Sequence, residues 1–170
     1  MDNRTVEEWS VDTLIREMAQ QLKQQLGERL QQAYIIGIHT GGTWVAEQLH
    51  QQLNNPHPLG ELNISFYRDD FTQIGLHPQV SPSNLPFEMD SAEIILVDDV
   101  LYTGRTIRAA LNEIFDFGRP ANVTLAVLVD REARELPIRA DVTGTCITLA
   151  SQQQIKLNGP DPLQLTLQEV

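Results

Sequence analysis

The fold is decided by one stretch of the chain, Ile94-Ile95-Leu96-Val97-Asp98-Asp99-Val100-Leu101-Tyr102-Thr103-Gly104-Arg105-Thr106. The apolar residues at its start indicate a strand that is covered on both faces. The adjacent carboxylates that follow are costly at the edge of a core unless they engage a partner, such as ligand hydroxyls or a hydrated magnesium ion. The residues from Thr103 to Thr106 then open a helix, whose first N–H groups and positive field favour a phosphate.

The turn itself has the composition of a phosphate site. Gly104 permits a tight turn and close approach of the backbone, the threonine hydroxyls add donors, and Thr106 is placed to cap the helix. A simpler interpretation stays open, in which Asp98 and Asp99 are a solvated loop feature and the threonines are only caps. Because apolar strand, acidic pair and small-residue turn occur together at this spacing, the sequence favours a ligand site.

Helices and strands alternate on both sides of this stretch. Apolar residues recur at helical spacing over 11–26, with Ser10 or Asp12 as the cap, and again over 43–53 and 107–115. Short apolar or alternating runs predict strands at 34–38, 62–66, 94–97, 123–129, 142–149 and 163–167. This order predicts an α/β fold, with a central, mostly parallel sheet flanked by helices.

Polar residues follow several of the predicted strands. In open parallel sheets, ligands bind at the carboxyl ends of the strands, near the switch in strand order. Outside the central stretch, the candidate site residues are therefore His39, Thr40, Gly41, Gly42, Arg68, Asp69, Asp70, Asp130 and Arg131. Two interpretations of Arg68 stay open, a contact to an anionic oxygen or an ion pair with Asp69, Asp70 or another acid.

The segment 72–91 shows no periodic pattern and contains Pro78, Pro82 and Pro86. Loops of this length inside a compact domain are usually functional lids or disordered segments. We expect a flexible lid loop, because the active-site strand follows directly; a tolerated surface insertion is the alternative.

Composition bounds the function further. The 170 residues, 41% apolar and 21% charged, are typical of one globular domain over 1–170. Nothing resembles a signal peptide or a membrane span, so a cytoplasmic protein is expected. A net charge of -11 argues against a general nucleic-acid binder. The single cysteine, Cys146, excludes an internal disulfide and is expected to be small buried filler.

Residues 94–106 resemble the motif of type I phosphoribosyltransferases. The flanking segments resemble, more narrowly, the PyrR proteins, which are bifunctional pyrimidine operon regulators and uracil phosphoribosyltransferases. The likeness runs from the first helix to about residue 149, and the segments that carry it are 62–70, 97–110, 118–120, 125–131 and 134–141.

The resemblance implies a type I phosphoribosyltransferase fold and the conversion of uracil and phosphoribosyl diphosphate to uridine monophosphate (UMP) and pyrophosphate. Asp98 and Asp99 would be the catalytic pair, holding the ribose hydroxyls and, partly through water, Mg²⁺. Catalysis would consist of positioning and charge stabilisation, without a covalent nucleophile. The phosphoribosyl diphosphate would be bound by Val100, Leu101, Tyr102, Thr103, Gly104, Arg105 and Thr106.

The remaining candidates have implied roles as well. The loop 39–42 would lie against the pyrophosphate, the lid 72–91 would exclude water, and Asp130 and Arg131 would face the base. Relatives form dimers and larger assemblies, which implies a homo-oligomer.

The pyrophosphate loop departs from the family pattern. Relatives commonly carry a basic residue, Thr, Arg and Gly, whereas this chain has His39, Thr40, Gly41 and Gly42. Less positive charge is therefore available for pyrophosphate. If the missing guanidinium matters, a Gly41→Arg chain is expected to show increased transferase activity.

The carboxyl-terminal third also departs from the pattern of relatives that bind a leader transcript. Those relatives carry a lysine after the glycine that corresponds to Gly144; here the residue is Thr145, and 150–154 is uncharged. Fewer cations weaken RNA affinity directly. Two interpretations of Arg131, Arg134 and Arg139 stay open: a reduced basic patch, or surface ion-pair partners. We expect binding of pyr leader RNA to be weakened or absent.

Three functions stay open on sequence alone. The first is an enzyme that makes UMP, which the acidic charge favours. The second is an RNA-binding attenuator that senses UMP or UTP with weak or vestigial transferase activity. The third is a nucleotide-binding regulator of other proteins.

Overall fold

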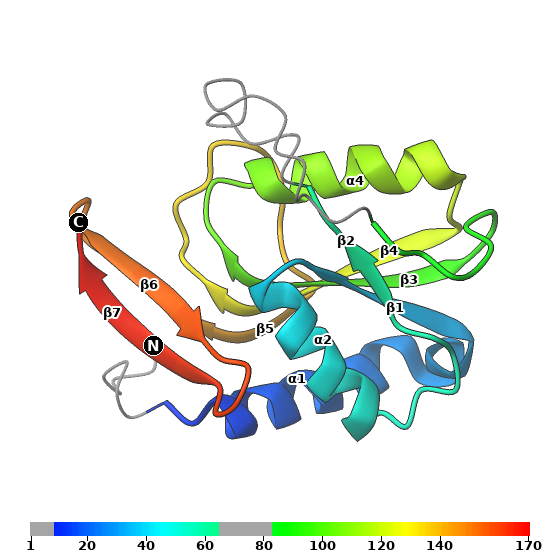
Figure 1. Ribbon diagram of the computed structural model, residues 1–170, viewed down its shortest axis with the longest axis horizontal. Helices are drawn as coiled ribbons and strands as arrows, with labels where there is room; N and C mark the ends of the chain where they lie inside the picture. Colours follow the sequence, from blue (N-terminus) through cyan, green and yellow to red (C-terminus); the bar gives the residue numbers. More distant parts are fainter. Residues whose placement is uncertain (1–8, 65–82) are drawn as a thin grey trace.

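The computed structural model describes residues 9–64 and 83–170. At its centre lies a five-stranded parallel sheet in the order β2-β1-β3-β4-β5. Helices cover both of its faces (Figure 1), which confirms the predicted α/β architecture. The strands are β1 (Ala33–Ile38), β2 (Gly60–Leu62), β3 (Glu93–Leu101), β4 (Asn122–Asp130) and β5 (Val142–Cys146).

The helices largely follow the predicted ranges and differ at their starts. They are α1 (Val11–Leu26), the 3₁₀ helix η2 (Gly27–Gln32), α2 (Gly41–Gln52) and α4 (Arg105–Phe117). Ser10 is the cap of α1, since its side chain accepts a hydrogen bond from the Thr13 N–H. The prediction that Thr106 caps the next helix is wrong: Gly104 is the N-cap of α4, and Thr106 lies in its first turn.

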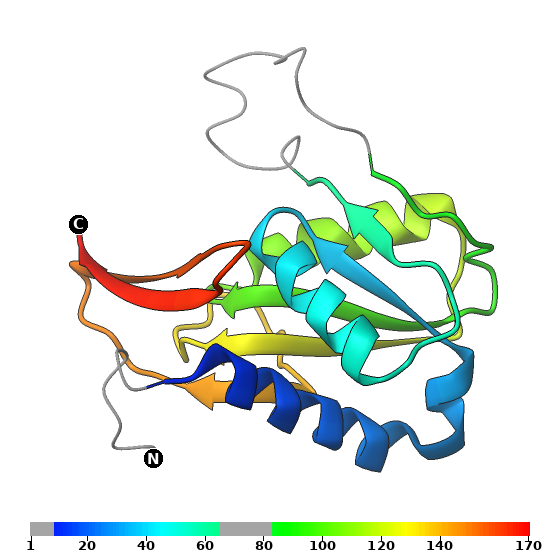
Figure 2. The ribbon, with the colours of Figure 1, turned by 60° about the horizontal axis from the view of Figure 1, so that its bottom comes forward.

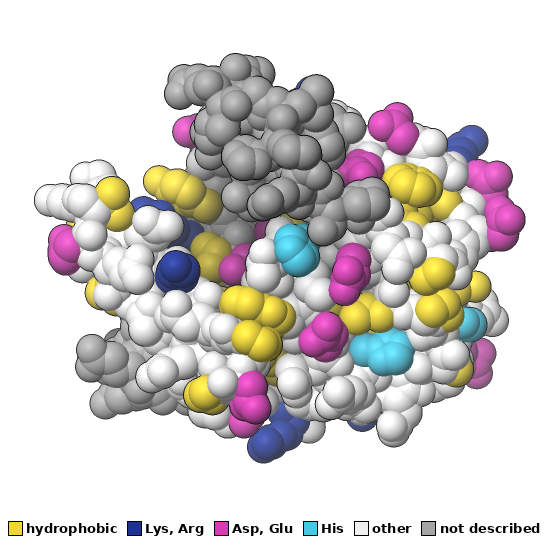
Figure 3. Space-filling view, viewed as in Figure 1, with side chains coloured by type: hydrophobic (Ala, Val, Ile, Leu, Met, Phe, Trp, Pro, Cys, Tyr) yellow, Lys and Arg dark blue, Asp and Glu magenta, His cyan; other side chains and the backbone are white. Residues whose placement is uncertain are grey.

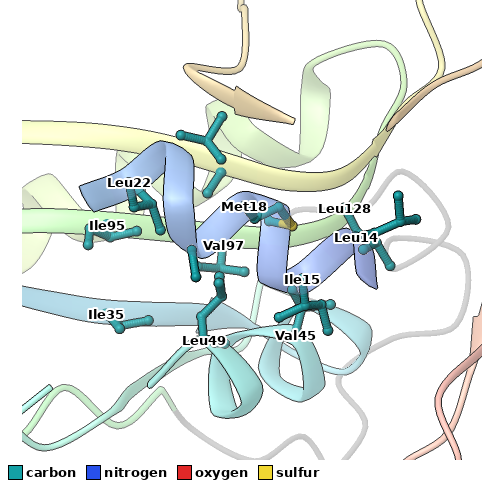
Figure 4. Close-up of a cluster of buried hydrophobic side chains, with 14 of the residues drawn as sticks. Leu14, Ile15, Met18, Leu22, Ile35, Val45, Leu49, Ile95, Val97 and Leu128 are labelled. Atoms are coloured by element: carbon teal, nitrogen blue, oxygen red, sulfur yellow. The ribbon is translucent and has the colours of Figure 1, made fainter. Parts of the chain in front are cut away.

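The core has one part on each face of the sheet. On one face, α1 packs its apolar stripe against the central strands and α2, as Figure 4 shows for Leu14, Ile15, Met18 and Leu22. On the other face, α4 buries Ile107, Ala110 and Ile114, among other residues, against the same strands. Both faces of the central strands are therefore shielded from solvent, which agrees with their continuous apolar runs.

Strand β3 is longer than the strand predicted at 94–97 and continues to Leu101. Asp98, Val100 and Leu101 all pair with β4, opposite Val127, Val129 and Asp130 respectively. The acidic pair therefore lies within the strand and not in a loop after it. The apolar Val100 and Leu101 and the long partner strand explain the extension, because pairing continues as long as both strands do.

The chain ends in an antiparallel hairpin of β6 (Gln153–Asn158) and β7 (Gln164–Glu169). A strand over 163–167 is confirmed by β7, whereas its partner β6 was not predicted. The predicted strand at 142–149 is shorter, ending at Cys146. Ile155, Leu157 and Leu165 anchor the hairpin in the core beside α1 and α2. Figure 2 shows that it lies beyond the carboxyl ends of the parallel strands.

The edge of the sheet next to β2 is closed by the described end of the predicted lid. The backbone groups of Asn84 and Glu61 exchange hydrogen bonds of 2.8 Å, and Met89 is buried. Residues 83–91 are thus part of the packed body. The rest of the predicted lid, together with the end of the strand predicted at 62–66, lies outside the described residues.

The prediction that Cys146 is buried filler is wrong, because this residue is exposed at the last position of β5. Partial desolvation raises the pKa of its thiol, and the nearby carboxylates of Asp130 and Glu132 raise it further. The thiol therefore stays protonated at neutral pH.

Among the described residues, no helix is long and apolar enough to cross a bilayer.

The segment 131–138 holds the end of β3 and the turn after it through the backbone. The N–H of Arg131 donates to the carbonyl of Leu101 at 2.9 Å. The N–H groups of Glu135 and Leu136 both donate to the carbonyl of Thr103, at 2.9 and 3.1 Å. The start of the phosphate-type turn is therefore fixed by a segment about thirty residues further along the chain.

Arg134 completes this connection with its side chain. Its guanidinium donates to the carbonyls of Tyr102 at 2.6 Å and Ile138 at 2.8 Å, and forms a 2.6 Å ion pair with Asp130. The Arg134 and Asp130 side chains are only 23% and 15% exposed, so solvent screens the pair weakly. One guanidinium thus ties the end of β3, the end of β4 and the following loop together.

Replacing Arg134 by glutamine should lower the free energy of unfolding by about 2 kcal/mol, because a half-buried carboxylate and backbone carbonyls lose their donor. Urea denaturation followed by circular dichroism measures the change. Arg139→Gln is the matched control, since Arg139 is exposed in the same segment. Equal stability of the two variants would contradict the assigned role.

Candidate active site

One cavity of about 540 Å³ lies at the carboxyl ends of the parallel strands. It brings together the loop after β1, the end of β3, the residue after β4 and the hairpin. In the space-filling view, acidic and basic side chains meet in the hollow between the hairpin and the rest of the molecule (Figure 3). The predicted residues in its wall are His39, Thr40, Gly41, Asp98, Asp99, Val100, Tyr102, Thr106 and Arg131.

The acidic pair is held by the backbone of its own strand. Asp98 is only 5% exposed, and its Oδ1 accepts the N–H of Asp99 at 2.9 Å. The Oδ1 of Asp99 accepts the N–H of Val100 at 2.8 Å. The pair therefore presents fixed negative charge and acceptor oxygens at the cavity.

The turn after β3 forms a smaller hollow of about 100 Å³ beside the cavity, sharing Val100, Tyr102 and Thr106 with it. Gly104 has φ 96°, a left-handed conformation that favours glycine. The hydroxyl of Thr103 accepts the N–H of Arg105 at 3.2 Å. The turn thus has the tight backbone that the sequence predicts.

Arg105 contributes to this turn through its backbone. Its guanidinium lies outside both hollows and donates to Glu135 at 2.8 Å, with both side chains more than half exposed. Such a surface pair contributes little to stability. The positive field at the turn therefore comes from the amino end of α4, not from this side chain.

The loop after β1 approaches the acidic pair closely. A Cβ added at Gly41 would lie 2.2 Å from Oδ2 of Asp99, so any larger residue there requires that carboxylate to move. Arginine at position 41 would therefore displace Asp99 as well as add charge. The expectation that Gly41→Arg increases transferase activity considered only the added charge and not this contact.

The amino ends of α2 and α4 both meet the cavity region. Helix α2 begins at Gly41, two residues earlier than predicted, and α4 begins at Arg105. The first N–H groups of a helix have no acceptor within it and carry partial positive charge. Both helices therefore favour anionic groups at this edge of the sheet.

Arg131 reaches the cavity, while Asp130 does not line it. The Arg131 guanidinium lies 3.9 Å from the centroid of the Tyr102 ring, and its Nη2 donates to the carbonyl of Gln153 at 2.9 Å. Asp130 is instead paired with Arg134. Of these two predicted residues, the structure brings only Arg131 to the cavity.

Several cavity residues were missed because they come from elements that the sequence pattern did not assign to the site. Trp44 lies on α2, and the hairpin contributes Gln154, Lys156 and Gln168. The alternation of Ile155 and Leu157 with polar residues was the available signal for β6. Arg68, Asp69 and Asp70 lie outside the described residues.

Carboxylate oxygens are suitable donors for Mg²⁺. Within the part of the chain that the structure describes, no three His, Cys, Asp or Glu side chains form a metal-binding group. The donors at the cavity are Asp98 and Asp99, a set that fits an ion which keeps several waters and binds ligand phosphates. The residues present thus fit magnesium held jointly with a phosphorylated ligand.

The arginines of the suggested RNA patch have different environments. Arg131 is 9% exposed and contacts Tyr102 and Gln153, and Arg134 is used in internal contacts. Arg139 is exposed. Thr145 is 7% exposed on β5. Of the three arginines, only Arg139 is therefore fully available at the surface.

Comparison with solved structures supports the fold. A hypoxanthine-guanine phosphoribosyltransferase from Bacillus anthracis superposes with a TM-score of 0.61 at 16% identity, covering 81% of this chain and 77% of that one. A hypoxanthine phosphoribosyltransferase from Trypanosoma cruzi gives 0.64 at 22% identity, covering 82% and 75%. At these identities the likeness concerns the fold alone.

Comparison of sequences identifies the family. The family model of the phosphoribosyl transferase domain matches residues 10–161. The "Bifunctional protein PyrR" of Nitrosococcus oceani is 60% identical over 164 residues, which cover 95% of this chain and 93% of that protein. The protein of the same name from Pseudomonas aeruginosa PAO1 is 60% identical over 153 residues, covering 89% and 90%. The chain therefore belongs to the phosphoribosyl transferase domain family and, within it, to the PyrR proteins.

Proposed function

We propose that the chain is a uracil phosphoribosyltransferase, which transfers ribose 5-phosphate from phosphoribosyl diphosphate to uracil and releases pyrophosphate. The observation that carries the proposal is the meeting of the acidic pair, the turn after β3 and the loop after β1 at one cavity and its adjoining hollow. These pieces suit the three parts of the donor, which are ribose hydroxyls, 5-phosphate and pyrophosphate.

The reaction breaks the bond between the anomeric carbon and the pyrophosphate oxygen, forms the bond to the uracil nitrogen and releases that nitrogen's proton. Asp98 and Asp99 accept hydrogen bonds from the ribose hydroxyls and stabilise positive charge that develops on the ring. Their fixed orientation avoids reorganisation during the reaction. When bound, magnesium, held by these carboxylates in part through water, would neutralise the pyrophosphate.

The other residues position the substrates. The backbone of 103–106 binds the 5-phosphate, the loop 39–42 binds pyrophosphate, and Arg131 stacked on Tyr102 lies toward the base. Arg68, Asp69 and Asp70, which precede the predicted lid 72–91 in the sequence, are proposed as further substrate contacts. Uracil as the acceptor rests on the PyrR relatives, not on a residue of the cavity.

A role in pyrimidine regulation is proposed from the same relatives, whose name is bifunctional. A homo-oligomer is proposed as well, and the exposed Phe115 and Phe117 on α4 are consistent with a contact there. The regulatory alternative, an attenuator that senses nucleotide and binds the pyr leader RNA, has less support because Arg131 and Arg134 are engaged inside the molecule.

Asp99→Asn should lower kcat/KM by about a hundredfold or more, because one fixed negative charge no longer stabilises the transition state. Pyrophosphate release that depends on both uracil and phosphoribosyl diphosphate, with Mg²⁺ present, measures the loss. Asp116→Asn, an exposed position on α4, is the control and should change activity less than about twofold. Full activity of Asp99→Asn, or no uracil-dependent turnover by the unaltered chain, would refute the proposal.

His39→Lys should lower the KM for phosphoribosyl diphosphate by about two- to fivefold at low salt, since it adds a full charge at an exposed side chain. Gly41→Arg, assayed beside it, should lower kcat because Asp99 has to move. Initial rates across donor concentrations separate the two effects. A higher kcat for Gly41→Arg would show that the displaced carboxylate is not needed in its present position.

Binding to the leader RNA of its own operon should be weak. Filter binding at about 50 and about 200 mM salt, with and without UMP, provides the measurement. A tight complex whose affinity falls steeply with salt would contradict this expectation and favour the attenuator. Arg139→Gln then tests whether the exposed arginine takes part.

A further inference from the structure

The charges in the wall of the cavity do not match the proposed donor. Asp98 and Asp99 are negative, and the loop after β1 offers only His39. Arg131 is positive, but its guanidinium already contacts Tyr102 and the Gln153 carbonyl and is almost completely buried. Pyrophosphate carries several negative charges, so another cation in the wall would add to the charge that the helix ends and bound magnesium supply.

Lys156 of β6 is that cation. It lines the cavity together with His39 and Gly41, and its side chain is exposed. Among the salt bridges of residues 9–64 and 83–170, none involves Lys156. Its ammonium group is therefore free to move toward a ligand, and a flexible lysine is a common phosphate binder.

Lys156 lies on the polar face of β6, and the cavity wall includes residues of both faces of this strand, Ile155 and Leu157 among them. Its neighbours Ile155 and Leu157 are 5% and 3% exposed and pack into the core. Because successive side chains of a strand point to opposite faces, Lys156 must point away from that core. Gln154 and Gln168 are paired residues on the same face and also line the cavity.

Both ends of the hairpin are fixed relative to the site. At the start of β6, the carbonyl of Gln153 accepts from Arg131. At the turn, Gly159 packs so closely on α2 that an added Cβ would lie 3.0 Å from the Trp44 ring. Trp44 belongs to the first turn of the helix that begins at Gly41. The hairpin is therefore attached to Arg131 at one end and to α2, the helix that follows the loop after β1, at the other.

We propose that Lys156 binds the pyrophosphate group of phosphoribosyl diphosphate and replaces the positive charge that the 39–42 loop lacks. This inference rests on the proposed function, because it assumes that the pyrophosphate lies against that loop. It places the missing cation on β6, in a hairpin that forms a separate sheet, and not in the loop after β1.

The test compares Lys156→Gln with Lys23→Gln. These are the only lysines of the chain, and Lys23 lies on the exposed face of α1. Calorimetric titration with Mg²⁺ present uses pyrophosphate, phosphoribosyl diphosphate and UMP as probes. Lys156→Gln should bind the first two about tenfold more weakly, with a smaller difference at high salt, and should bind UMP unchanged. Lys23→Gln should bind all three like the unaltered chain.

Two further variants separate charge from structure. Lys156→Arg should retain most of the pyrophosphate affinity, and His39→Lys combined with Lys156→Gln should recover part of it. Equal pyrophosphate affinity of Lys156→Gln and Lys23→Gln would overturn the inference. An equal loss for UMP would also overturn it, because UMP has no pyrophosphate group.

The same titrations distinguish failure of this inference from failure of the proposed function. If the unaltered chain binds phosphoribosyl diphosphate but does not convert uracil, the proposed function fails, and the inference is decided by the binding data alone. If it binds and converts while Lys156→Gln matches Lys23→Gln, only the inference fails. If it binds neither pyrophosphate nor phosphoribosyl diphosphate, both are overturned.

Discussion

The structure depends on holding two neighbouring carboxylates at the end of a buried parallel strand. Asp98 is nearly inaccessible, yet its Oδ1 accepts a backbone N–H, as does that of Asp99. Such charges are tolerable in a core only when fixed donors compensate them. The close approach of Gly41 to Asp99, the turn at Gly104 and the contacts of the segment 131–138 all surround this pair. The site is therefore organised before any ligand arrives.

Positive and negative features are divided among different elements of the fold. The strands present the carboxylates, whereas the amino ends of α2 and α4 supply partial positive charge. Arg134 is used to fix the backbone of the turn, and Arg131 to connect the turn with the hairpin. Arginines that resemble a surface patch in the sequence thus act mainly inside the molecule. This division gives a chain of net charge -11 positive features at the carboxyl ends of its strands.

Most strands of the parallel sheet, and the α-helices around it, were predictable because they have a continuous apolar run or a helical stripe. The exception is β2, which covers Gly60–Leu62 and so begins two residues before the strand predicted at 62–66. The acidic pair and its turn were predictable too, since their residue types and spacing are distinctive. The contribution of the hairpin to the site was not predictable. The alternating pattern of β6 covers only six residues, and this strand lies far from the other site residues in the sequence and meets them only in the folded chain. Contacts such as Gly41 with Asp99, or Arg134 with Tyr102, join distant segments and leave no periodic signal. The exposure of Cys146 likewise depends on where β5 ends. The apolar pattern predicted a strand to residue 149, whereas β5 ends at Cys146.

The separate pairing of β6 with β7 has a consequence for evolution. The hairpin makes its ladder hydrogen bonds within its own two-stranded sheet, and besides the Arg131 contact to the Gln153 carbonyl its apolar face connects it to the core. Substitutions on the opposite face, at Gln154, Lys156 or Gln168, therefore leave the parallel sheet undisturbed. Such a surface can exchange charge for neutral groups in single steps while the fold is retained. The polar lining of the cavity can thus change independently of the residues that determine the architecture.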